Sequence, residues 1–150
     1  MKFETKDVPA ISLLVATQKM KDVSEVPHFG GSVLPKVDEK AKAMNIRAPG
    51  AEIFIYKFQE GGAFEIRGGV PVKTDKGDTG EFQFFTAPAV KVISCIHKGS
   101  MPTIRQSWDA LTQEAKKQKL EFTNEIREIY LKWVDFDSAE NLTELQRVLK

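Results

Sequence analysis

The chain has 150 residues, with 22 basic and 21 acidic side chains and a hydrophobic fraction of 41%. A chain of this length can form one domain that buries about two-thirds of its unfolded surface. The near-zero net charge gives no electrostatic basis for direct nucleic-acid binding, and no apolar run is long enough to span a bilayer. The start of the chain has no signal-peptide pattern and there is one cysteine, so we expect a cytoplasmic protein that does not contact a membrane.

The first half of the chain predicts the order strand, helix, strand, strand. The helix begins near residue 32, where apolar residues recur every three or four positions, and Pro49-Gly50 ends it. A tight turn at 60–63 joins the two later strands, and we expect Gly68-Gly69 to break the second of them. The predicted elements are a strand within 8–20, a helix over 32–47, and strands over 51–59 and 64–73.

The second half repeats this order, with strands within 81–98, a helix over 103–120, and strands over 125–134 and 142–149. Val8-Pro9-Ala10-Ile11 aligns with Ala87-Pro88-Ala89-Val90, 79 residues later. We therefore predict an α+β fold: one domain over 1–150 made of two pseudo-symmetric β-α-β-β units, at about 1–76 and 81–150. The two units are expected to form a curved antiparallel sheet backed by two helices.

The strand over 125–134 carries a carboxylate and a phenol on one face. Glu128 and Tyr130 are two residues apart, so their side chains point the same way. They belong either to a solvated face or to the polar centre of an apolar pocket. In the repeat alignment Glu128 falls on Phe54, and an acid that replaces an aromatic residue in one half only favours the pocket.

Four segments, in order along the chain, resemble a known family. They are Phe64–Val72 with its Gly-x-Pro-Val ending, the His97–Ser100 turn followed by a helix with Trp108, Glu128–Leu131 with its Glu-x-Tyr core, and Leu142–Leu145. Together they are similar to the GyrI-like small-molecule-binding domain, which has a SOUL-like fold and is also the effector domain of AraC- and MerR-type multidrug regulators. Two positions depart from the pattern: Met101 replaces an aromatic residue, and Trp133-Val134-Asp135 replaces a frequent Asp-Pro.

The resemblance implies a ligand cleft between the two halves, with Glu128 as the central acid that meets bulky aromatic or cationic small molecules. No helix-turn-helix pattern accompanies the domain, so a stand-alone member is expected. By chemistry alone the aromatic residues are more typical of the core, whereas the resemblance makes some of them pocket walls. The predicted ligand-binding residues are Glu128, Tyr130, Tyr56, Phe54, Trp108 and Phe58.

Two other functions stay open at this point. The first is a hydrolase of strained cyclopropane electrophiles, in which Glu128 activates water and Tyr130 or Tyr56 donates to the developing anion. The second is modulation of a protein partner, as in gyrase-modulating relatives. No cofactor and no metal site are predicted: Cys95 and His97 share a strand face, but no third ligand stands at a recognisable spacing.

Overall fold

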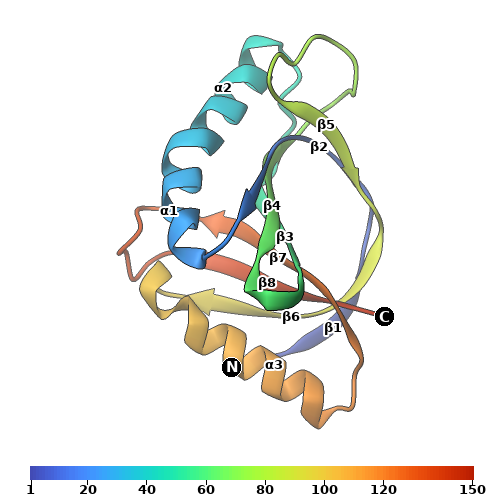
Figure 1. The fold of residues 1–150 in the computed structure, drawn as a ribbon, viewed down its shortest axis with the longest axis vertical. Helices are drawn as coiled ribbons and strands as arrows, with labels where there is room; N and C mark the ends of the chain where they lie inside the picture. The colour runs from blue at the N-terminus through green and yellow to red at the C-terminus, as the bar shows by residue number, and fades with distance from the viewer. The chain divides into compact units, whose positions relative to one another are not determined.

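The structure, a computed structural model that describes residues 1–150, has an α+β architecture and confirms the predicted fold class. Its eight strands and two long helices divide between two compact units (Figure 1). Unit 1 comprises residues 1–9 and 89–150, and unit 2 comprises residues 10–88. Strand pairing within each unit is antiparallel throughout. No helix is both long enough and apolar enough to cross a bilayer.

Unit 2 has four strands in the order β3-β4-β2-β5, and helix α2 packs against β4 and β2. Helical turns at Val23–Glu25, α1 (Val26–His28) and a π-helical segment at Phe29–Val33 lead into α2. The buried face of α2 carries Leu34, Val37 and Ala41, and the last two belong to the apolar spacing that predicted this helix. The elements are β2 (Ile11–Met20), α2 (Leu34–Ala43), β3 (Glu52–Phe58), β4 (Phe64–Pro71) and β5 (Gln83–Ala87).

The prediction that Gly68-Gly69 breaks a strand was wrong, because β4 runs without interruption from Phe64 to Pro71. A Cβ atom on Gly68 would overlap the ring of Phe29, and one on Gly69 would overlap the backbone carbonyl of Leu14 on β2. The two glycines therefore leave room for a buried ring on one face and for a close strand on the other.

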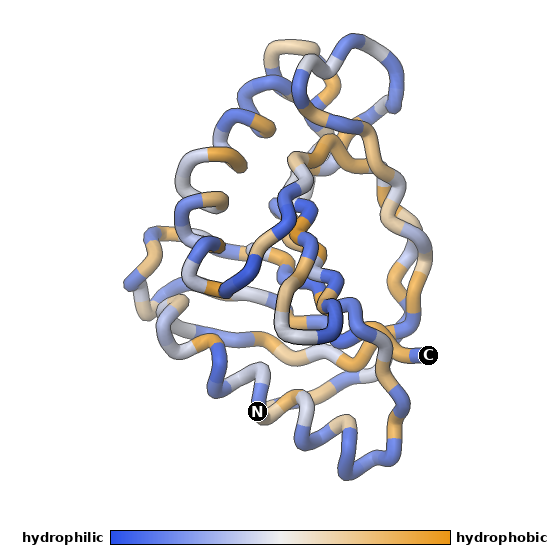
Figure 2. The backbone as a smooth tube through the Cα atoms, viewed as in Figure 1, coloured by the Kyte–Doolittle hydropathy of each residue, from blue (hydrophilic) through white to orange (hydrophobic).

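Unit 1 repeats the arrangement, with strand order β1-β6-β8-β7 and helix α3 packed against β6 and β8. The helix buries Leu111 and Ala115 against a strand cluster that includes Ile93 and Leu145, as the helical spacing predicted. Figure 2 shows hydrophilic stretches along α3 that alternate with more hydrophobic ones, whereas the loop between β4 and β5 is largely hydrophilic. The elements are β1 (Glu4–Val8), β6 (Val90–Lys98), α3 (Ile104–Lys117), β7 (Phe122–Lys132) and β8 (Leu142–Leu149).

In each unit, one edge strand is continuous in the chain with a strand of the other unit. β1 comes before β2 in the chain but pairs with β6, whereas β5 comes before β6 and pairs with β2. The chain therefore passes from unit 1 to unit 2 after Pro9 and returns after Pro88, the two prolines that the repeat aligned. β1 was not predicted, since its sequence is mostly charged and lacks an apolar alternation.

Candidate functional site

Glu128 lies on the face of unit 1 that α3 covers. It is directly opposite Leu145 on β8, whose side chain belongs to the cluster packed under that helix. The residue is only 6% exposed, so the solvated-face alternative is excluded for this carboxylate. Burying a carboxylate is costly unless donors meet its oxygens. The surroundings of Glu128 must therefore supply donors.

Both carboxylate oxygens of Glu128 accept hydrogen bonds from aromatic side chains. The indole Nε1 of Trp108 on α3 donates to Oε2 at 2.9 Å, and the hydroxyl of Tyr130 on β7 donates to Oε1 at 2.7 Å. The second bond confirms that Glu128 and Tyr130 share one strand face. The first joins a helix to a strand, so the carboxylate is fixed from two elements of the same unit.

This arrangement has a definite chemical capacity. The two donors described here are neutral, so they satisfy the carboxylate by hydrogen bonding and bring no positive charge to it. Both donors carry aromatic rings, which attract cations at their faces. An acid bracketed by a tryptophan and a tyrosine is suited to meeting an aromatic cation.

A buried histidine fixes the helix that carries Trp108. His97 on β6 has Nε2 at 3.0 Å from the carbonyl oxygen of Ser100 and Nδ1 at 2.7 Å from the hydroxyl of Ser107 on α3. A carbonyl only accepts, which assigns the ring proton to Nε2, so the hydroxyl of Ser107 donates to Nδ1. Ser107 directly precedes Trp108, and the pair therefore sets the rotation of the helix that turns the indole towards Glu128. Sequence reasoning missed this role, because nothing in the local pattern links the two residues.

The other three predicted site residues lie on β3 in unit 2. Phe54 and Tyr56 are buried, and the ring of Tyr56 stacks on that of Phe58 with centroids 6.2 Å apart. Phe54 packs edge-on against Phe29 at 5.5 Å. At aligned positions, one unit thus packs two aromatic rings together while the other joins an acid to an indole. The structure brings Trp108, Glu128 and Tyr130 into direct contact, and the contribution of the β3 aromatic residues to a ligand site stays a prediction.

The hydroxyl of Thr143 beside this site has no hydrogen-bond partner. Thr143 is fully buried and lies on β8 between His97 and Tyr130 in the strand register. Because its strand neighbours share the α3-facing side, the hydroxyl borders the polar group around Glu128. An unsatisfied buried hydroxyl is uncommon in a folded protein, and sequence reasoning gave Thr143 no role.

An open depression of about 390 Å³ lies on unit 2, between Lys42, Arg47 and Lys73. The Arg47 guanidinium is already held by Asp38 at 2.8 Å and by the carbonyl of Gly50 at 3.1 Å. None of the predicted site residues lines this depression, and its arginine serves to anchor the local loop.

No protein-family model and no curated protein matches this chain, but solved structures do. SAV2435 bound to tetraphenylphosphonium aligns with a TM-score of 0.71 and 11% identity, over 100% of this chain and 94% of that one. The EcmrR C-terminal domain aligns with a TM-score of 0.76 and 20% identity, over 99% of this chain and 97% of that one. The chain has the fold of these domains. The resemblance to GyrI-like domains is therefore confirmed at the level of the fold.

Two further matches show the range of proteins with this fold. EcmrR in complex with DNA aligns with a TM-score of 0.82 and 23% identity, and the present chain spans 57% of that longer chain. A protein described as a hydrolase from Listeria innocua aligns with a TM-score of 0.65 and 12% identity, over 99% of this chain and 92% of that one. One fold thus occurs in a ligand-bound protein, a DNA complex and a protein described as a hydrolase.

Proposed function

We propose that the protein binds bulky aromatic cations, with Glu128 as the anionic anchor. The observation that carries this proposal is the buried carboxylate whose two oxygens are held by Trp108 and Tyr130. The likeness in fold to a structure bound to tetraphenylphosphonium supports it. Phe54, Tyr56 and Phe58 remain predicted ligand-binding residues within this proposal.

The chemistry of the site favours a cation with aromatic substituents over other ligands. A bulky onium ion is weakly hydrated, so it loses little hydration when it leaves water. Its charge is attracted both by the carboxylate and by the faces of the neighbouring rings. A neutral compound of the same shape gains the apolar contacts but not the attraction of the carboxylate. Charge dependence is therefore the signature of this function.

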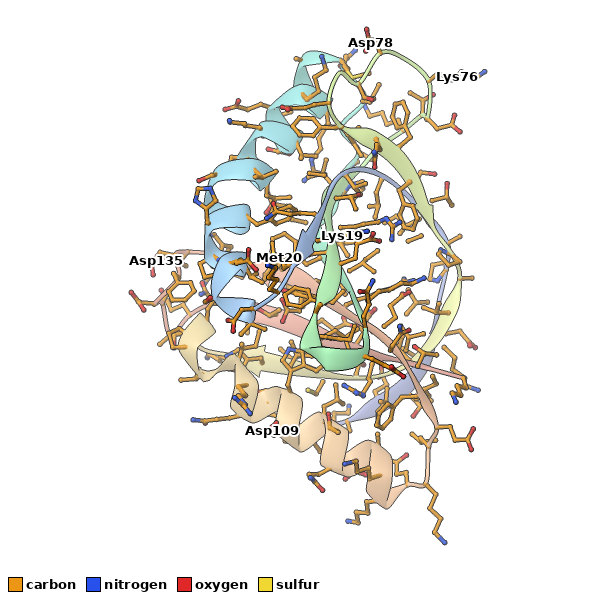
Figure 3. The ribbon with its side chains drawn as sticks, viewed as in Figure 1. Lys19, Met20, Lys76, Asp78, Asp109 and Asp135 are labelled. Atoms are coloured by element: carbon orange, nitrogen blue, oxygen red, sulfur yellow. The ribbon has the colours of Figure 1, made fainter.

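The test compares two ligands of similar shape and different charge. Calorimetric titration measures the Kd of methyltriphenylphosphonium, a cation, and of triphenylphosphine oxide, which is neutral. Glu128→Gln should raise the Kd of the cation about tenfold or more and should change the Kd of the neutral compound little. Asp109→Asn removes an exposed acid that directly follows Trp108 on α3 and should change neither, which controls for net charge (Figure 3). Equal losses for both ligands in Glu128→Gln would refute the role of charge.

A second candidate, hydrolysis of a strained electrophile, is supported by the 2.7 Å hydrogen bond between Tyr130 and Glu128. Glu128 would take a proton from water as the water oxygen attacks a cyclopropane carbon. The ring C–C bond breaks, and its electron pair moves onto a conjugated carbonyl oxygen that a tyrosine hydroxyl stabilises. Mass spectrometry would detect the hydrated product. Repeated turnover that is lost in Glu128→Gln, with binding retained, would establish the enzyme; a stoichiometric protective effect would leave only the binder.

A further inference from the structure

The loop that leaves β7 exposes an unusual amount of apolar surface. Trp133 and Val134 are each 50% exposed and Phe136 is 42% exposed, next to an equally exposed Leu131 at the strand end. Single exposed apolar residues need no explanation, but four within six positions mark a surface with a function. Figure 3 shows Asp135, in the middle of this segment, on the loop that projects beyond the strand.

The loop is held firmly in place. The side chain of Asn141, which is completely buried, accepts from the backbone N–H of Val134 at 2.8 Å and donates to the carbonyl of Asp135 at 2.6 Å. The backbone N–H of Met101, just before α3, donates to the carbonyl of Phe136 at 2.9 Å. The exposed rings therefore stand on a fixed backbone, which keeps the entropic cost of using them in binding low.

A β-bulge directs Trp133 towards the site. Tyr130 pairs with Thr143 and Lys132 with Leu142, so Leu131 is an extra residue on β7. One extra residue reverses the alternation of side chains along a strand. Trp133, three residues after Tyr130, consequently packs edge-on against the ring of Tyr130, with centroids 5.8 Å apart and planes at 81°. Tyr130 in turn donates to Glu128.

A continuous row thus runs from an exposed indole through a half-buried phenol to a buried carboxylate. We infer that Trp133 forms an outer subsite that holds an aromatic ring of the ligand while Glu128 attracts its charge. The inference rests on the proposed function and specifies its ligand class as cations that carry aromatic rings, in preference to aliphatic cations. Trp133 lies in the segment where the chain departs from the pattern of the family that it resembles.

The experiment compares methyltriphenylphosphonium with tetrabutylphosphonium, a bulky cation without rings, by calorimetric titration. Trp133→Leu keeps an apolar side chain but removes the ring. It should raise the Kd of the aromatic cation about five- to tenfold and that of the aliphatic cation less than about twofold. Trp133→Phe should retain most of the affinity. Val23→Ala removes an exposed apolar side chain outside this segment, and it should leave both Kd values unchanged.

The outcomes separate failure of this inference from failure of the proposed function. If Trp133→Leu binds both cations as tightly as the parent protein, or if its affinity for both falls by the same factor, the aromatic subsite is refuted. Glu128→Gln, measured with tetrabutylphosphonium, reports on the anionic anchor alone, because that ligand has no ring to stack. If Glu128→Gln weakens cation binding but Trp133→Leu does not, only the subsite is refuted. If Glu128→Gln binds tetrabutylphosphonium with an unchanged Kd, the proposed function itself is refuted.

Discussion

The hydrogen bond from Trp108 to Glu128 should make a measurable contribution to folding stability. A hydrogen bond to a charged group contributes about 1.5–3 kcal/mol, and the acceptor here is 6% exposed at a distance of 2.9 Å. Trp108→Phe keeps an aromatic ring but removes the donor. Adding a loss of packing of about 1 kcal/mol, we expect the free energy of unfolding to fall by about 2.5–4 kcal/mol, which lowers Tm by about 5–16 °C in a chain of this length.

A double-mutant cycle separates the hydrogen bond from the packing. In a Glu128→Leu background no carboxylate is left to satisfy, so Trp108→Phe should cost only about 1 kcal/mol. Urea denaturation followed by far-ultraviolet circular dichroism measures all four proteins without relying on tryptophan emission. Equal costs of Trp108→Phe in the two backgrounds would show that the indole and the carboxylate are not coupled, and the geometry of the site would then be wrong.

Three further predictions concern the surroundings of the site. Thr143→Val replaces an unpartnered buried hydroxyl by a methyl group of similar shape, so urea denaturation should show unchanged stability or a gain of up to about 1 kcal/mol; a clear loss would contradict the absence of a partner. Gly68→Ala should cost about 1–3 kcal/mol because its Cβ would overlap the ring of Phe29, whereas Gly31→Ala, which has open space around it, should cost nothing; equal effects would refute the packing argument. Burial raises the pKa of the Cys95 thiol to about 11, so Ellman's reagent at pH 8 should modify the native protein about 100-fold more slowly than the urea-unfolded chain, and similar rates would refute this burial.

Much of the fold could be predicted because the periodic apolar residues are the ones that pack. Val37, Ala41, Leu111 and Ala115 all lie on the buried faces of their helices. The break expected at Gly68-Gly69 failed for a physical reason: a glycine that ends a strand and a glycine that admits a neighbouring ring look the same in sequence. Only the position of Phe29, 39 residues earlier, distinguishes the two.

The site was predictable only where its residues are local. Glu128 and Tyr130 share a face because strand alternation requires it, and their hydrogen bond follows from that spacing. The bond from Trp108 depends on the rotation of α3, which His97 and Ser107 set through tertiary contacts. Simple strand alternation would put Trp133 on the face opposite Tyr130, but the alternation reverses at the bulge, and no residue type in the segment indicates a bulge.

The exchanged edge strands impose a waiting time on the growing chain. β1 is synthesised before the strand that it pairs with, because Val8 pairs with Val90, which is added 82 residues later. At typical rates of synthesis that interval lasts about 4–16 s, during which the backbone of β1 has no strand partner within its unit. A strand that waits in this way invites association with other chains unless its side chains oppose it. The charged side chains of Glu4, Lys6 and Asp7 disfavour such pairing, so the composition that concealed this strand from prediction also protects its free edge until β6 is made.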